Sequence, residues 1–437
     1  MIVQLDSPDH HSWLAGESDR LVSFFSPSTD GDAIHFGWRD NQGLPDGSRS
    51  EQLYSAARLI YCFSIEHVFG RPQAGSWAKM GIERLLERFH DPLYGGFYVE
   101  VRADGTVTSN RKETYGHAFA LLAGATAMRS GIDGGKELFE LAHRAIDEHL
   151  WEDSYGVALE SCTQDWTLSE DYRGQNSNMH LTEAYLAAFE ATGKSTFVER
   201  AERIAKRLIL QNASLHDWRV PEHYNADWTV NRSYAADNPT DPFRPYGTLT
   251  GHSLEWARLL LQLHALRPSN DWVPDVSARL FSRALSDGWN TTEGGIIYSV
   301  DFDGAPINRS HMHWTVAEGI GAALWLFRTT KEKWYSDWYA KFWKYADAYV
   351  LDMKNGSWRH ELDEHNVPAL TTWDGKPDLY HAWQATTYAR VKGNLSITEA
   401  ALTKAVVSAR HTQQNSPFTT GTSCASLPDE VASRNAS

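Results

Sequence analysis

The chain has few of the features that mark several large protein classes. Its 437 residues include only 3 cysteines, without a CxxC motif, which excludes a disulfide scaffold and fits a reducing compartment. No apolar run approaches the roughly 18 residues that a membrane-spanning helix needs. The first residues show no basic segment followed by an apolar one, so no secretory signal is expected. These absences predict a soluble, cytoplasmic protein that does not enter a membrane.

Positive charge is also scarce. There are 41 Lys and Arg against 56 Asp and Glu, and the net charge of −15 argues against nucleic acids and anionic membranes as partners. No P-loop, GxGxxG or GxSxG motif occurs, and no cofactor is expected. Aromatic residues, in contrast, are abundant, with 18 Trp, 18 Tyr and 17 Phe. Such rings fill helical cores, and they also form the walls of carbohydrate sites, where sugar C–H faces stack on them.

Long amphipathic segments alternate with short β-like connections along most of the chain. After a leading helix at 8–26, the segments form six pairs: 49–69 with 74–90, 114–130 with 135–150, 178–192 with 195–211, 251–266 with 270–287, 313–329 with 333–351, and 377–392 with a weaker 396–411. The connections recur roughly 60 residues apart, as in repeat architectures. The pattern predicts an all-α (α/α)6 barrel with short β-hairpin connections between the helix pairs.

No linker interrupts this series, so residues 1–412 are predicted to form a single catalytic domain. From residue 413 to 437 the composition turns to Gln, Asn, Ser, Thr and Pro with few apolar residues. Such a segment cannot bury enough apolar surface to order itself. We therefore expect a disordered C-terminal tail over 413–437.

Polar residues recur where the predicted inner helices begin. They are Tyr54 and Arg58; Tyr115 and His117; Asn176 and His180; Arg244, His252 and Glu255; Trp314 and Glu318; and Asp378, His381 and Trp383. Each of them alone is explained equally well by a capped helix end or by a satisfied polar group inside the barrel. Histidines at matching points of three repeats are harder to explain in this way, because unrelated core histidines need not keep register. The set predicts a site at this end of the barrel.

The stretch 243–261 runs from a Gly-rich loop into a helix. His252 and Glu255 are three residues apart there, which places them on one face of the first turn. They are predicted to form a titrating pair at the mouth of a pocket. The alternative is that Glu255 only stabilises the positive end of the helix dipole.

Two histidine motifs resemble metal sites. His360 and His365 flank Glu-Leu-Asp-Glu, which places them five residues apart, one more than a zinc-binding helix requires, so this segment is predicted to be a hairpin. His311 and His313 could hold a metal, but no cysteine or further histidine lies at ligand spacing nearby. No metal is expected.

Three motifs carry a family resemblance. Residues 176–184 (NSNMHLTEA), 244–257 (RPYGTLTGHSLEWA) and 376–385 (KPDLYHAWQA) resemble the N-acylglucosamine 2-epimerase superfamily, and within it most closely the D-mannose isomerases and sulfoquinovose isomerases. The likeness runs from about Trp13 to Arg390. It implies an (α/α)6 barrel and metal-free interconversion of an aldose and its ketose.

The resemblance also implies roles for individual residues. The family's catalytic histidines fall on His252 and His381, with His180 and Glu255 assisting. Its substrate contacts fall on Arg58, Tyr115, Asn176 and Trp314. From their places at the helix starts, three further residues are predicted to bind substrate: Arg244, Glu318 and Trp383.

Departures from the sulfoquinovose isomerases bear on the substrate. Pro242 stands where they are expected to carry arginine, Pro377 where they carry glutamine, and Tyr54 where they carry tryptophan. Without that cation a desolvated sulfonate would lack a partner, so a neutral hexose is favoured. The implied partner is a monosaccharide, either mannose or fructose, with lyxose or talose as further candidates. A homo-oligomer is compatible with the sequence.

The chemistry suits these residues. Moving a carbonyl from C1 to C2 requires a group that titrates near neutrality to remove the C2 proton, and histidine is that group. The enediolate that forms needs hydrogen-bond donors, a role for Arg58 or His180. A sugar 2-epimerase would share these steps. A glycoside hydrolase would instead use two carboxyl groups, for which Glu255 and Glu318 are candidates. A non-catalytic sugar-binding protein would need the aromatic residues but no clustered histidines.

Overall fold

A computed structural model describes residues 5–27, 36–241 and 243–403. The predicted tail 413–437, Pro242 and the second half of the predicted helix 396–411 lie outside these ranges. Within the described part of the chain, no helix is long and apolar enough to cross a membrane.

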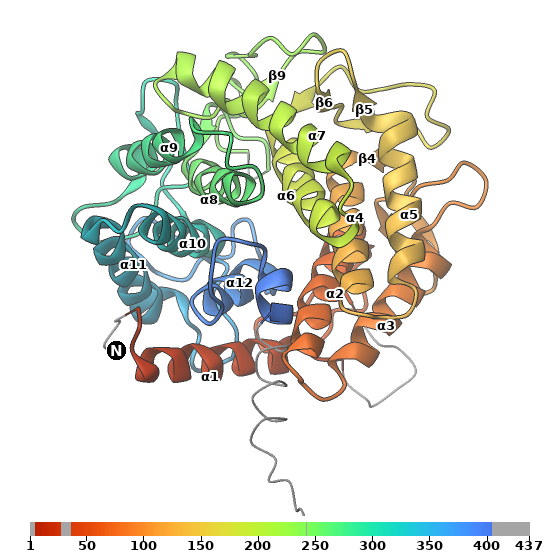
Figure 1. Cartoon of the computed structure of the whole chain (residues 1–437), viewed down its shortest axis with the longest axis horizontal. Coiled ribbons are helices and arrows are strands. Elements are labelled where there is room, and N and C mark those ends of the chain that lie inside the picture. Colours follow the sequence, from red (N-terminus) through yellow and green to blue (C-terminus); the bar gives the residue numbers. More distant parts are fainter. Residues whose placement is uncertain (1–4, 28–35, 242, 404–437) are drawn as a thin grey trace, which may run out of the picture.

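Six helices form an inner ring, and their axes run along the direction of view in Figure 1. Their buried residues lie on nearly all sides, because each inner helix contacts its two neighbours in the ring and an outer helix. The ring confirms the predicted barrel. The inner helices are α2 (Leu53–Val68), α4 (Thr114–Arg129), α6 (Gln175–Thr192), α8 (Thr250–Leu266), α10 (His313–Thr330) and α12 (Tyr380–Tyr388).

Six amphipathic helices cover this ring from outside (Figure 1). They are α1 (Pro8–Phe25), α3 (Ala74–Arg84), α5 (Gly135–Ala145), α7 (Ser195–Ala205), α9 (Val273–Gly288) and α11 (Lys333–Tyr345). Four of them continue into wider π-helical turns, namely η1 (Leu85–Phe89), η2 (Ile146–Leu150), η3 (Lys206–Asn212) and η5 (Ala346–Val350). A short 3₁₀ turn, η4 (Ala213–His216), follows η3.

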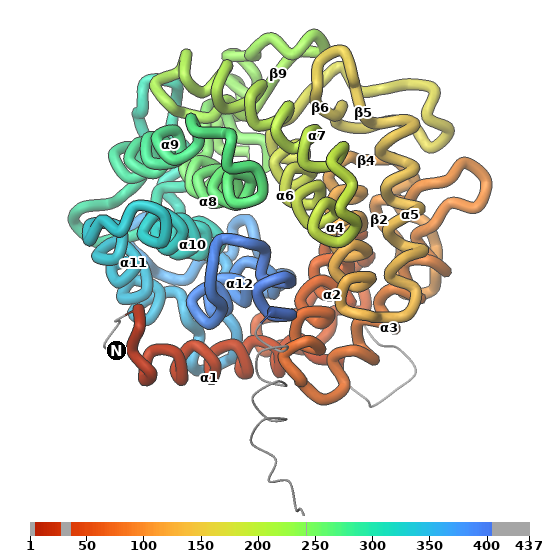
Figure 2. Tube along the Cα trace, in the orientation of Figure 1, coloured from red at the N-terminus to blue at the C-terminus, as the bar shows by residue number. Residues whose placement is uncertain are grey.

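The sixth helix pair differs from the prediction. The helix that packs against α12 is α1, and Figure 2 shows this first helix running along the side of the ring where α12 lies. Leu14, Leu21 and Val22 of α1 are fully buried. The described part of the segment predicted as the outer partner, residues 396–403, begins instead beside the inner helices, where Ile397 is 2% exposed and lines a cavity with Arg258 and Tyr388. The N-terminal helix therefore completes the outer layer beside α12.

Short strands form the connections at one end of the barrel, as predicted. They are β1 (Glu51–Gln52), β2 (Glu100–Val101), β3 (Val107–Ser109), β4 (Lys112–Glu113), β5 (Trp151–Glu152), β6 (Val157–Ala158), β7 (Ser161–Cys162), β8 (Arg173–Gly174), β9 (His223–Tyr224), β10 (Thr248–Leu249), β11 (Ser299–Val300), β12 (Pro306–Asn308), β13 (His311–Met312) and β14 (Glu361–Leu362). The strand before each of five inner helices pairs antiparallel with the next connection. These pairs are β1 with β2, β4 with β7, β8 with β9, β10 with β11, and β13 with β14.

These pairings also fix the start of each inner helix. The first N–H of five inner helices donates to a carbonyl in the connection that follows: Leu53 to Val99, Thr114 to Glu160, Gln175 to Glu222, Thr250 to Tyr298, and His313 to His360, at 2.9–3.3 Å. A helix N-terminus leaves N–H groups without intrahelical partners, and these carbonyls satisfy one in each helix. The first turns of the inner helices therefore meet at a single end of the barrel.

Candidate active site

His252 lies in the first turn of α8, and its ring is held by Glu222. Both Glu222 oxygens lie 2.9–3.0 Å from His252 Nδ1. The Gln175 amide donates to Glu222 at 2.9 Å and lies 2.7 Å from the same Nδ1. Because an ionised carboxylate with two oxygens in reach is the strongest acceptor here, it favours the proton on Nδ1 and leaves Nε2 as the basic nitrogen.

The predicted pairing of His252 with Glu255 is wrong. Glu255 contacts Arg258 and His180 instead, at 3.5 and 3.7 Å. Three residues along a helix place two side chains on one face, but they do not decide which neighbour each side chain reaches. His252 turns toward the connection that carries Glu222, whereas Glu255 lies among the buried groups of the inner ring.

His381, the second residue of α12, repeats the arrangement seen at His252. Its Nδ1 lies 2.9 Å from Glu318 Oε1, and Arg258 Nε donates to the other oxygen of Glu318 at 2.8 Å. The guanidinium keeps Glu318 ionised, so this carboxylate also favours a proton on Nδ1 of its histidine. Burial lowers the pKa of His381, partly opposed by the bond to Glu318.

The indole of Trp314 lies beside both histidines. Its ring centroid is 5.1 Å from that of His252 and 5.9 Å from that of His381. Neither Nε2 atom has a hydrogen-bond partner among the described residues. Two imidazoles therefore share one aromatic wall, and each has a basic nitrogen free for a ligand.

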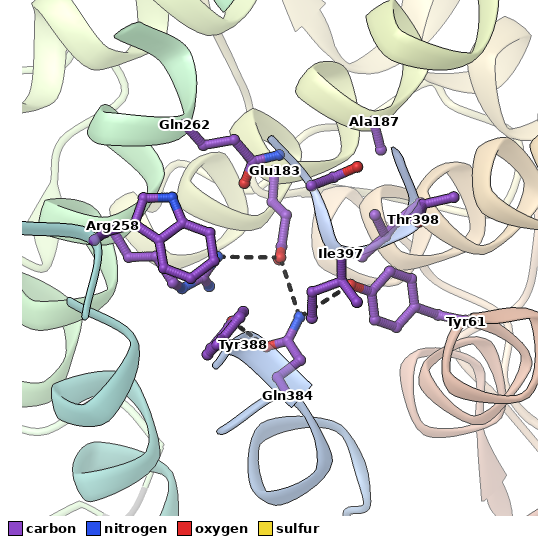
Figure 3. A pocket seen from close by; sticks show the side chains of 12 residues that line it. Tyr61, Glu183, Ala187, Arg258, Gln262, Gln384, Tyr388, Ile397 and Thr398 are labelled. Atoms are coloured by element: carbon purple, nitrogen blue, oxygen red, sulfur yellow. Dashed lines mark hydrogen bonds and ion pairs between the residues drawn. The ribbon is translucent and has the colours of Figure 1, made fainter. Parts of the chain in front are cut away.

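Arg258 organises the carboxylates beneath this pair. Its guanidinium lies 2.8 Å from Glu318, 3.5 Å from Glu255 and 3.6 Å from Glu183. Figure 3 shows Glu183 reaching Arg258 on one side and Gln384 on the other. The arginine side chain is 2% exposed, so the whole group is shielded from solvent.

Glu255 and Glu318 have pKa values that are shifted in opposite directions. Burial and the neighbouring Glu318 charge raise the pKa of Glu255 well above its usual range. Burial opposes ionisation of Glu318 too, but Arg258 and His381 outweigh it, and its pKa is lowered. Of the two, Glu255 therefore favours the neutral form, which can donate a hydrogen bond, and Glu318 favours the ionised form beside His381.

Two groups in this region have ligand atoms close enough for a metal ion. They are His180 with Glu183 and Glu255, and Glu255 with Glu318 and His381, each with atoms within 4.8 Å of one another. Arg258 contacts a carboxylate of both groups and already supplies the counter-charge. A divalent ion would have to sit beside this guanidinium, which is unfavourable.

His180, on α6, faces the aromatic side of the site. Its ring lies 4.6 Å from that of Phe119 and 5.3 Å from that of Tyr115. Burial lowers its pKa to about 3, despite Glu183 nearby. His180 is therefore neutral near physiological pH, where it can orient an oxygen but cannot supply a proton from an imidazolium.

Arg58 and Asn176 also lie at this end of the barrel. Arg58 donates to the Tyr115 hydroxyl at 2.9 Å and lies over the Phe119 ring at 4.3 Å. Its Nε is buried without a partner within the described part of the chain, as is Asn176 Oδ1. Buried polar atoms without partners indicate groups that a polar ligand can satisfy.

Two predicted contacts lie differently. Arg244 sits in the loop before β10 and pairs with Glu170 at 3.0 Å and Glu160 at 3.7 Å, so its charge is already neutralised. Trp383 points away from the histidines. Its indole is fully buried, and its N–H donates to Glu66 at 2.7 Å. Successive positions of α12 face different sides, and Trp383 is left out of the proposed site.

Glu222 and Gln175 were not predicted from the sequence to belong to the site. Glu222 immediately precedes β9 in a connection 30 residues before His252, and Gln175 begins α6. A connection recurring before each inner helix was visible in the sequence. Only the strand pairing shows that one connection supplies a carboxylate to the histidine of the next repeat.

Comparison with known proteins places this arrangement in a family. Residues 35–385 match the model for N-acylglucosamine 2-epimerase (GlcNAc 2-epimerase). The chain is 42% identical over 381 residues to the D-mannose isomerase of Thermobifida fusca, covering 86% of this chain and 93% of that protein.

Structural similarity agrees. A crystal structure of D-mannose isomerase superposes with a TM-score of 0.83 at 29% identity, covering 89% of this chain and 99% of the other. A more distant relative, the cellobiose 2-epimerase of Dictyoglomus turgidum, is 21% identical over 345 residues, covering 74% of this chain and 83% of that protein.

Proposed function

The chain belongs to the N-acylglucosamine 2-epimerase family, and from this membership and the paired histidines we propose that it is an aldose–ketose isomerase. Its substrate is D-mannose, or a closely related neutral hexose, which it interconverts with D-fructose. The observation that carries this proposal is the repeated unit of an imidazole whose Nδ1 faces a carboxylate and whose Nε2 is free. His252 with Glu222 and His381 with Glu318 form two such units beside one indole.

In the proposed mechanism, His381 Nε2 takes the C2 proton of the open-chain aldose. The electrons of the C–H bond form the C1–C2 double bond, and the carbonyl oxygen at C1 becomes the enediolate oxygen. The proton of the O2 hydroxyl then passes to O1, and as His252 delivers a proton to C1 the electrons on O2 form the C2 carbonyl of the ketose. His252 also assists ring opening. Its carboxylate partner Glu222, rather than Glu255, stabilises the imidazolium that forms in this exchange.

The enediolate is stabilised by donors that are already in place. Arg58 has an unpartnered Nε, Glu255 is neutral, and His180 is a neutral imidazole. Held in place, these groups need no reorganisation as charge develops on the sugar oxygens. Tyr115, Asn176 and Trp314 contact the sugar, and Arg244 at the rim, with its charge neutralised, is compatible with a neutral substrate.

Glu255 and Glu318 do not suit glycoside hydrolysis. Glu318 is ionised but committed to Arg258 and His381 through both of its oxygens. A hydrolase needs its second carboxylate free to act as a nucleophile or to activate water. The geometry therefore favours proton transfer by histidine.

The function is tested by incubating EDTA-treated enzyme with D-mannose in D₂O and separating the products by chromatography. We expect fructose with deuterium at C1, since a solvent-exchangeable histidine delivers the proton. Glucose without fructose would identify a 2-epimerase, because glucose is the C2 epimer of mannose. Activity that is lost with EDTA and restored by one divalent ion would contradict the metal-free mechanism.

The pH dependence of kcat/KM should carry the signature of His381. Only its neutral form accepts the C2 proton, and its pKa lies below the ordinary 6.5 because of burial. As pH falls through this lowered pKa the base is protonated, so the fall in kcat/KM due to His381 is expected below pH 6.5.

Glu318→Gln provides the matched comparison for this pH profile. The bond to Glu318 raises the pKa of His381, so removal of the Glu318 charge should lower that pKa. The decline of kcat/KM on the acid side should then begin at a lower pH, and kcat should fall as well. Initial rates between pH 4.5 and 8 measure both profiles. A limb that moves to higher pH in Glu318→Gln would contradict the assignment.

A further inference from the structure

The start of α12 differs from those of the other inner helices. In the other five, the first N–H donates to a backbone carbonyl of the following connection. In α12 the Tyr380 N–H instead donates to the side chain of Asp378, Oδ1, at 3.1 Å. The Asp378 N–H in turn donates to His360 Nε2 at 3.1 Å. A carboxylate therefore stands where the fold elsewhere uses a peptide group, three residues before His381.

Asp378 lies between two basic side chains from different helices. Arg58 Nη1, from α2, is 3.5 Å from Oδ1, and His313 Nε2, from α10, is 3.7 Å from Oδ2. Both distances exceed an ordinary hydrogen bond. Among the described residues, the Tyr380 N–H is the only hydrogen-bond donor to this carboxylate. The two carboxylate oxygens thus lie beside two basic side chains, but they can still accept further hydrogen bonds.

His313 faces acceptors with both ring nitrogens. Its Nδ1 lies 3.4 Å from the His360 carbonyl oxygen, and its Nε2 faces Asp378 and has no hydrogen-bond partner within the described ranges. His360 is the neutral member of the pair, because its Nε2 accepts from the Asp378 N–H and its Nδ1 lies 3.2 Å from the Trp358 carbonyl. Both ring nitrogens of His313 thus lie toward oxygens, which places the ring against Asp378.

Arg58 and His313 keep Asp378 ionised although it is buried. Burial alone would raise its pKa, but Arg58 and His313 outweigh burial and hold the pKa well below its usual range. The carboxylate side chain is 12% exposed, so it is the least buried member of the group. A nearly buried anion with unused acceptor positions is costly unless a donor reaches it.

We propose that Asp378 is a further substrate contact, which accepts hydrogen bonds from hydroxyl groups of the sugar, and that His313 is the side chain that positions it. The proposal rests on the proposed function. The His313 ring lies 6.4 Å from that of His381, and Arg58 binds Tyr115, so the same substrate is in reach of all of them. Sugar hydroxyls are donors that an ionised carboxylate binds well. The pair His311 and His313, considered in the sequence as metal ligands, thus separates: His311 binds Asn366, and His313 faces the site.

The test uses Asp378→Asn, which keeps an oxygen that can accept from the Tyr380 N–H but removes the charge. Binding of D-mannitol, a non-reacting open-chain hexitol, is measured by calorimetry, together with KM and kcat for D-mannose. We expect Kd and KM to rise about 10- to 100-fold, with a smaller fall in kcat. Glu364→Gln removes an equal charge from an exposed side chain on the neighbouring hairpin and should leave all three constants unchanged.

Single-deoxy mannoses identify the hydroxyl. In the wild type, the analogue that lacks the bound hydroxyl should lose as much kcat/KM as Asp378→Asn does with mannose. In Asp378→Asn, replacing mannose by that analogue should cause no further loss of kcat/KM, since the variant already lacks the interaction. If the 3-, 4- and 6-deoxy analogues all lower kcat/KM in Asp378→Asn as much as they do in the wild type, the proposal is overturned.

His313→Gln tests the positioning role. It should raise KM and Kd with kcat less affected, and Asp378→Asn with His313→Gln should be no worse than Asp378→Asn alone. His313→Lys, which places an ammonium donor beside Asp378, should recover part of the loss. If Asp378→Asn lowers the melting temperature but leaves Kd unchanged, Asp378 is only a helix cap. Unchanged mannitol binding overturns this inference alone, whereas a wild type that binds mannitol without turning over mannose refutes the proposed function alone.

Discussion

Replacement of His381 or His252 by alanine is expected to lower kcat by about 10²–10⁴-fold, the usual loss when a general acid or base is removed. Each imidazole presents an unpartnered Nε2, and each has a dedicated carboxylate at Nδ1. Because Arg58, Tyr115 and Asn176 remain, sugar binding should change far less. Steady-state kinetics with D-mannose and calorimetry with D-mannitol separate the two effects.

The two variants should differ in isotope exchange. His381→Ala should stop loss of the C2 hydrogen, whereas His252→Ala should slow later steps and ring opening; a reversed pattern would exchange the two roles. His365→Ala, at a 68% exposed side chain, is the matched control and should keep full activity. Near-normal kcat in both His381→Ala and His252→Ala would remove the basis of the mechanism.

Arg258→Met is expected to lower the free energy of unfolding by about 3–5 kcal/mol, since it leaves buried carboxylates without their counter-charge. Burial would raise the pKa of Glu183, but Arg258 and then His180 outweigh it and lower this pKa to about 2. Arg258 also holds Glu318, the partner of His381. The variant should therefore lose activity together with stability. Denaturant unfolding followed by circular dichroism measures the stability change.

The pH dependence distinguishes this cause from simple loss of packing. In Arg258→Met the folded-state pKa values of Glu183 and Glu318 should rise above their unfolded values. A raised carboxyl pKa stabilises the fold at low pH and loses that contribution as pH rises. The difference in the free energy of unfolding between Arg258→Met and the wild type should thus be smaller at pH 5 than at pH 8. Arg279→Met, at an exposed ion pair with Asp275, should show almost no deficit at either pH. A constant deficit would indicate lost packing alone.

The barrel could be predicted because its signals are local and repeated. Five helix pairs and their hairpins follow from apolar periodicity and from connections with Gly, such as Gly95–Gly96 and Gly294–Gly295, all four with positive φ. The sixth pair could not be predicted in the same way. Its members, α1 and α12, come from opposite ends of the chain, and no periodicity links segments so far apart.

The site was only partly predictable for a similar reason. Helix spacing brought His252, His381 and His180 to one end of the barrel. It could not assign their partners, because Glu222 reaches His252 through strand pairing and Glu318 reaches His381 across a helix interface. Asp378 illustrates the limit: in the sequence it resembles a helix cap, and only its distances to Arg58 and His313 suggest a further role.

The packing of α1 against α12 orders events during synthesis. The ribosome makes α1 first, but its partner emerges about 350 residues later, which at 5–20 residues per second is roughly 20 to 70 s. During this time Leu14, Leu21 and Val22 have no inner helix to cover them. The apolar face of α1 therefore waits for α12 during synthesis. The ring can close between α1 and α12 only after α12 has been made.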